Sequence, residues 1–169
     1  MRNDHDEDIK TRTMANDLLL PAFIAQLQAN PGEAYSLPLR GNSMRPFLKD
    51  GRDKALLTLP SALSVGDAVL AFVDQRRYVL HRIVAIYGDS VTLRGDGNTH
   101  TEHCTLDDVK AVALGFFRKG SHRLDSTSSP KWRLYSWLWC RLLPVRRYLL
   151  FALSPHWPQR FRTTKKQKQ

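Results

Sequence analysis

Four residues in the middle of this chain have the types and the order that peptide-bond hydrolysis requires. They are Ser43, His81, Asp96 and Glu102. A serine hydroxyl becomes a nucleophile when a neighbouring base takes its proton, and histidine suits that role because its reference pKa is about 6.5. A carboxylate can orient the imidazole and stabilise the imidazolium. Together the four residues predict a serine hydrolase site with a histidine base.

The surroundings of Ser43 favour an exposed hydroxyl on a turn. A strand-like segment at 35–40 runs into Gly41 and Asn42, and Pro46 breaks the pattern shortly afterwards. Glycine permits backbone conformations that other residues rarely adopt, so the turn can lift the serine clear of the sheet. Taken alone, a serine beside a glycine is equally typical of an ordinary turn.

His81 lies within a second strand-like segment, at 78–84. Alternation places it on the same face as Val79 and Ile83, so it is expected to be partly buried. A buried histidine satisfied by a hydrogen bond would look the same. Asp96 and Glu102 are both available to orient the ring, and the spacing does not decide between them; Asp96 also suits a turn and Glu102 a solvated position.

Most of the remaining pattern predicts a mainly β domain. Short apolar segments between turn signals are expected to form strands, at 34–39, 54–59, 68–73, 77–87, 90–94 and 109–117. Short strands at this density favour an antiparallel β-barrel or a pair of sheets. Apolar residues near helical spacing predict a helix at 16–28, which would cover one side of the core.

These patterns divide the chain into four parts. A disordered lead is expected at 1–14, the catalytic domain with its N-terminal helix at 15–119, a polar linker at 120–130, and a basic, aromatic, helical tail at 131–169. The lead shows no signal peptide, and no uncharged apolar run reaches 18 residues. We therefore expect a cytoplasmic or peripheral membrane location.

Four short motifs resemble, in order and approximate spacing, the conserved boxes of the signal peptidase I family. They are Ser43-Met44 followed by Pro46, then Gly66-Asp67-x-Val69-x-x-Phe72, then Val79-x-His81-Arg82-Ile83-Val84, then Gly95-Asp96-x-Asn98. The resemblance covers roughly residues 36–117. It is greatest to the archaeal and endoplasmic-reticulum branch, in which a histidine stands where bacterial enzymes carry a lysine.

The resemblance implies a role for each candidate residue. Ser43 matches the nucleophile, His81 the general base and Asp96 the aspartate of the last box, while Glu102 stands near a further catalytic aspartate of that branch. The family usually has a serine where this chain has Gly41, so backbone N–H groups near Ser43 would form the oxyanion hole. The implied fold is the family's all-β, barrel-like assembly with an extended substrate cleft.

Two other functions remain open. The chain also resembles the LexA-like self-cleaving proteases, although these generally use a lysine base and carry a separate DNA-binding domain. A non-catalytic peptide-binding scaffold would have the same strands. A peptide or preprotein is the expected substrate, with no cofactor. His100, His103 and Cys104 could approach one another, but no second Cys/His pair completes a zinc site.

The tail has a different charge from the rest of the chain. Residues 1–130 are formally neutral, whereas 131–169 contain ten Lys and Arg and no acidic residue. Tryptophan and arginine interleaved with leucine suit a helix at an anionic membrane surface, through residues 131–162. The alternatives are a helix that packs on the domain, and binding of single-stranded nucleic acid, against which the absence of any nucleic-acid motif argues.

Overall fold

The computed structural model describes residues 16–119, 121–142, 145, 148 and 150. The lead expected at 1–14 and most of the tail beyond 142 lie outside the described residues. The elements, in chain order, are α1 (Asn16–Ala29), β1 (Ala34–Pro38), β2 (Lys54–Thr58), β3 (Ala68–Val73), β4 (Arg77–Tyr87), β5 (Ser90–Arg94), β6 (Glu102–Thr105), a 3-10 turn (Leu106–Asp108), β7 (Val109–Phe117), β8 (Leu124–Ser126) and α2 (Pro130–Arg141).

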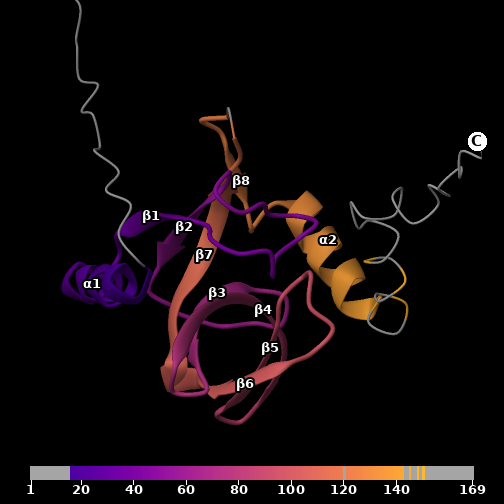
Figure 1. Cartoon of the computed structure of the whole chain (residues 1–169), viewed down its shortest axis with the longest axis horizontal. Coiled ribbons are helices and arrows are strands. Elements are labelled where there is room, and N and C mark those ends of the chain that lie inside the picture. Colours follow the sequence, from indigo (N-terminus) through magenta and orange to yellow (C-terminus); the bar gives the residue numbers. More distant parts are fainter. Residues whose placement is uncertain (1–15, 120, 143–144, 146–147, 149, 151–169) are drawn as a thin grey trace, which may run out of the picture.

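The strands form one curled, antiparallel sheet in the order β1-β2-β7-β3-β4-β5-β6, with β8 paired to β7. Figure 1 shows α1 against one side of this sheet and α2 near the opposite side. The expectation of a mainly β fold with an N-terminal helix and a C-terminal helix is confirmed. Two strands, β6 and β8, were not expected, and β8 lies within the segment that composition suggested was a linker.

The core has two parts. Alternating residues of β3, β4, β5 and β7 fill the inside of the curl, including Val69, Ile83 and Leu93, all fully buried. A second cluster lies under α1, which buries Leu20, Ile24 and Leu27 at helical spacing. The second cluster also includes Trp132 of α2, so this helix completes the core.

The register of the sheet positions the candidate base and its acid. Ile83 of β4 pairs with Leu93 of β5, and Leu93 pairs with Glu102 of β6. His81 lies two residues before Ile83, so it points to the same face of the sheet as this row. Glu102 can therefore reach His81 diagonally across β5.

No helix in the described part of the chain combines the length and the apolar character needed to cross a bilayer.

Candidate active site

Ser43 lies in a turn, residues 41–48, that follows β1. It is half-buried, while Met44 and Leu48 after it are buried and anchor the turn to the core. Gly41 begins the turn with φ +90°, a conformation that glycine adopts at little cost, and its N–H donates to Oδ1 of Asp50 at 3.0 Å. The turn therefore holds the serine at the surface of a fixed framework.

The buried carboxylate of Asp53 holds the chain that follows this turn. Its carboxylate accepts from the N–H of Lys49 at 3.0 Å and forms an ion pair with Arg52 at 2.6 Å. Burial acts to raise the pKa of Asp53, but the Arg52 guanidinium and backbone N–H donors outweigh it and hold that pKa below its ordinary value. Nothing in the sequence pattern marked Asp53 as a support for the turn.

His81 and Glu102 are in contact in the interior of the domain. Nδ1 of His81 lies 2.6 Å from Oε2 of Glu102, with side-chain exposures of 2% and 6%. The ring N–H is not aligned with this oxygen as in a straight hydrogen bond, and neither atom bonds another described residue. The other oxygen of Glu102 accepts from Arg77, which holds the carboxylate in place. A carboxylate that faces Nδ1 favours the tautomer with its proton on Nδ1, which leaves Nε2 as the basic nitrogen.

Nε2 of His81 points to the place where the Ser43 turn meets residues 95–98. A methyl group added at Gly95 would lie 2.9 Å from Nε2 of His81 and 2.6 Å from the carbonyl oxygen of Ser43. The N–H of Gly97 donates to that same carbonyl at 2.6 Å. The backbone of Ser43 and Nε2 of His81 therefore both adjoin Gly95, where a methyl group would be closer to each than an ordinary contact allows.

The Ser43 hydroxyl makes no hydrogen bond with any described residue. Serine–histidine hydrogen bonds are often long before substrate binds and tighten in the reacting complex. Burial lowers the pKa of His81 below its ordinary value of 6.5, an effect that the nearby Glu102 carboxylate opposes and that Arg77 reinforces. The imidazole is therefore neutral at pH 7, the form that a general base needs.

Asp96 pairs with Arg82. Its two oxygens accept from Nε and Nη2 of Arg82 at 2.9 and 2.7 Å, and both side chains are 1% exposed. Arg82 also donates to the carbonyl oxygen of Gly66 at 2.7 Å and to the hydroxyl of Ser136. Of the two carboxylates suggested by the sequence, Glu102 is the one beside His81, and Asp96 holds the buried arginine that follows it.

A small cavity of about 30 Å³ adjoins Ser43. Its lining is mixed: Leu39, Met44, Leu48 and Leu80 stand beside Arg40, Lys49, Gly41 and Ser43. A space of this volume favours a small side chain.

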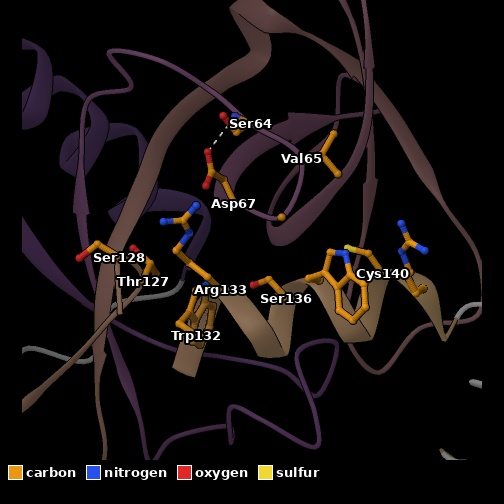
Figure 2. Close-up of a pocket in the computed structure, with 12 residues that line it drawn as sticks. Ser64, Val65, Asp67, Thr127, Ser128, Trp132, Arg133, Ser136 and Cys140 are labelled. Atoms are coloured by element: carbon orange, nitrogen blue, oxygen red, sulfur yellow. Dashed lines mark hydrogen bonds between the residues drawn. The ribbon is translucent and has the colours of Figure 1, made fainter. Parts of the chain in front are cut away.

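A larger cavity, of about 670 Å³, lies along α2 and does not contain Ser43 or His81. Figure 2 shows it between α2 and the turn before β3, with Ser64, Val65 and Asp67 facing Arg133, Ser136 and Cys140. The candidate site is therefore placed at the Ser43 turn, which borders the smaller cavity, because the Gly95 backbone beside this turn also adjoins Nε2 of His81.

Residues suited to binding a metal do not converge. In the described part of the chain no group of three or more His, Cys, Asp or Glu side chains is arranged to hold a metal ion. His103 contacts the Thr92 hydroxyl at 3.3 Å, and His100 is 4.0 Å from the Glu102 carboxylate. Burial raises the pKa of Cys104 to about 11, so its thiol is neutral at pH 7.

No protein-family model matches this chain, and no curated protein matches it either.

Proposed function

We propose that this protein is a serine endopeptidase of the signal-peptidase type, with Ser43 as nucleophile, His81 as general base and Glu102 as the residue that orients His81. The observation that carries the proposal is the placement of His81. Its Nδ1 faces the buried Glu102 carboxylate at 2.6 Å, and its Nε2 lies beside the Gly95 backbone next to Ser43. A neutral imidazole with its basic nitrogen beside a serine is the arrangement that acyl transfer requires.

The reaction follows from this arrangement. As Ser43 Oγ attacks the scissile carbonyl carbon, its proton moves to Nε2 of His81, and the imidazolium is stabilised by the Glu102 carboxylate. Backbone N–H groups near Ser43 stabilise the oxyanion. The intermediate collapses to an acyl-enzyme, and the proton on Nε2 goes to the departing amine. Water then attacks the ester by the same steps, releasing the acid and restoring Ser43.

The cavity beside Ser43 favours a small residue before the scissile bond. It adjoins the nucleophile and has a volume of about 30 Å³. A peptide with alanine at that position would fit, and one with leucine or phenylalanine would not. The substrate class is accordingly a peptide or preprotein with a small residue at the cleavage site.

The direct test uses the full chain and internally quenched soluble peptides that differ only in having alanine or leucine before the scissile bond. We expect cleavage of the alanine peptide, with the new amino terminus located by mass spectrometry, and no cleavage by Ser43→Ala. Self-cleavage of the intact chain on mild alkaline incubation would favour the LexA-like alternative instead. If the chain cuts neither the peptides nor itself, the peptidase proposal fails and the scaffold alternative remains.

The outward face of α2 supports a second proposal, of a partner rather than a reaction. Leu134, Trp137 and Leu138 are 64%, 54% and 46% exposed there. Arg141 lies over the Trp137 ring at 4.9 Å, and the chain from 131 onward has no acidic residue. Exposed apolar side chains among cations suit the interface of an anionic bilayer, so we propose that this face rests on such a membrane.

A further inference from the structure

One face of α2 contacts both turns that meet at the candidate site. Trp132, Tyr135, Ser136 and Trp139 recur at helical spacing and lie along one stripe. Trp132, Ser136 and Trp139 are buried, in contrast to the exposed Trp137 between them. The helix is thus attached to the domain by a defined inner face.

The inner face holds the serine turn through an aromatic stack. Phe47 lies four residues after Ser43, and its ring stacks on Tyr135 with centroids 4.2 Å apart. It also meets Trp132 edge-on at 4.8 Å, while the Arg118 guanidinium covers it at 4.2 Å. Phe47 is therefore packed against the inner face of α2, and a shift of the turn that carries Ser43 would disrupt these ring contacts.

The same face holds the turn at 95–98. Nε1 of Trp139 donates to the backbone carbonyl of Asp96 at 3.2 Å, and the Tyr135 hydroxyl lies 3.4 Å from the Asp96 carboxylate. Ser136 accepts from Arg82, whose guanidinium forms the paired bonds to Asp96. A backbone contact and a buried ion pair thus connect α2 to the residue between Gly95 and Gly97.

These contacts matter because the two turns touch at the backbone of Ser43, beside Nε2 of His81. Gly97 donates to the Ser43 carbonyl at 2.6 Å, and Gly95 borders both that carbonyl and Nε2 of His81. We propose that α2 is a clamp that fixes the Ser43 turn against the 95–98 turn, with Tyr135 and Trp139 as positioning residues for the serine and histidine. This inference rests on the proposed function for its catalytic part, but the clamp itself is a property of the fold.

Positioning of this kind affects turnover more than binding. A displacement of about 1 Å at the reacting atoms can lower the rate by about 10²-fold. A substrate peptide would bind along the outside of the Ser43 turn, where no α2 residue lines the small cavity. Loosening the clamp should therefore lower kcat and leave KM nearly unchanged.

The experiment compares two tryptophans of one helix. Trp139→Phe removes the donor to Asp96 and keeps an aromatic ring, whereas Trp137→Phe makes the same change at an exposed position. Each full-length variant is assayed with a soluble peptide, and amide hydrogen exchange is followed at Gly97 and Asn98. Val91, a fully buried residue of β5, serves as the reference amide. We expect Trp139→Phe to speed exchange at Gly97 and Asn98 but not at Val91, and to lower kcat roughly ten- to hundred-fold.

The outcomes separate the clamp from the chemistry. If no peptide is cleaved even by the wild type, the proposed function fails, and the exchange at Gly97 still tests the clamp. Unchanged Gly97 exchange in Trp139→Phe overturns the clamp, as does a faster exchange that reaches Val91 equally, because that indicates general destabilisation. Faster Gly97 exchange with unchanged kcat overturns the positioning role. If Trp139→Phe does not fold, Tyr135→Phe, which keeps the stack on Phe47 and removes only the hydroxyl, is judged by the same criteria.

Discussion

Nδ1 of His81 and Oε2 of Glu102 lie 2.6 Å apart in the interior of the sheet, although 21 positions separate them along the chain. The adjacent Arg82 points to the other face of β4 and pairs with Asp96. Two neighbouring residues of one strand thus each receive one of the two candidate carboxylates. Because successive side chains of a strand point to opposite faces, Glu102 meets His81 on one face of β4 and Asp96 meets Arg82 on the other.

Exchanging each carboxylate for its amide should separate these roles. Glu102→Gln removes the charge that stabilises the imidazolium, so kcat should fall by about 10²–10⁴-fold in a folded protein. Asp96→Asn leaves the Arg82 guanidinium buried without its counter-charge, which should cost about 3–5 kcal/mol of unfolding free energy. Peptide turnover and urea denaturation measure the two effects. Loss of activity in a stable Asp96→Asn protein, with Glu102→Gln active, would reverse the assignment.

Ser43 and His81 should behave as one unit. Ser43→Ala and His81→Ala are each expected to abolish nearly all turnover, and the double variant should be little worse than either. The three proteins and the wild type are compared on one soluble peptide at saturating concentration. Multiplicative losses would show that the two side chains act independently, and wild-type activity in Ser43→Ala would end the protease proposal.

The sequence predicts much of the fold because the apolar alternation is regular. The six expected strands agree with the structure to within one residue at each end, and the helix at 16–28 ends one residue later. By contrast, β6 contains Glu102, His103 and Cys104, and β8 contains Leu124, Asp125 and Ser126, so neither has the apolar alternation that marks a strand. They are strands because each pairs with a backbone edge that is open: β6 with β5, and β8 with residues 115–117 of β7.

The carboxylate could not be assigned from the sequence because its identity depends on strand register. Glu102 reaches His81 only because β6 pairs with β5 at Leu93, a long-range choice that no local motif encodes. The docking of α2 was one of three open alternatives for the tail. The spacing of Trp132, Tyr135, Ser136 and Trp139 was the available signal, since it places these side chains on one face of a helix.

The pH dependence of kcat/KM should reflect the buried position of His81. Because burial lowers its pKa, the acid limb of the profile should have its midpoint below 6.5. The Glu102 carboxylate raises this pKa and the Arg77 guanidinium lowers it. Glu102→Gln should therefore move the acid limb to lower pH and Arg77→Gln should move it to higher pH.

The lowered pKa of His81 also makes the stability of the folded protein depend on pH. The unfolded chain binds the His81 proton more readily than the folded one, so stability rises with pH through this region and is lost as pH falls below about 6.5. Thermal melts of wild type and His81→Gln between pH 7 and pH 5 test this. The placement of a neutral, buried imidazole would be contradicted by two results together. The melting temperature would fall equally with pH in the two proteins, and the acid limb of the kcat/KM profile would have its midpoint above pH 6.5.

Gly95 provides a test of how tightly the site is packed. A methyl group there would lie 2.6 Å from the Ser43 carbonyl and 2.9 Å from Nε2 of His81, so Gly95→Ala should displace one of them and lower kcat roughly a hundred-fold. Gly32→Ala is the matched control, because an added methyl has no neighbour within 4 Å there and only the backbone strain at φ +92° is felt. That variant should lose about 1 kcal/mol of stability and keep its turnover. Full activity in Gly95→Ala would show that the site is open at this point.

If the outward face of α2 rests on a membrane, binding to anionic vesicles should have a salt-dependent and a salt-resistant component. The full chain is expected to sediment with vesicles that contain anionic lipid, and added salt should weaken this binding, because each Lys or Arg held at the surface contributes about 1 kcal/mol and is screened by ions. Insertion of Leu134, Trp137 and Leu138 should leave a salt-resistant remainder.

Point substitutions are the suitable probe, because removing α2 would expose Trp132, which is 3% exposed and packs on Phe116 in the core. Trp137→Ala should reduce the salt-resistant remainder, and Arg133→Gln with Arg141→Gln should reduce the salt-dependent part. Tyr87→Ala, which removes an exposed aromatic ring on β4, should change neither. All these variants should cleave a soluble peptide as the wild type does, since none of the altered side chains touches Ser43, His81 or Glu102. Binding that is equally strong to neutral vesicles, or that disappears entirely in salt, would mean that the basic and apolar residues of α2 do not act together at a membrane.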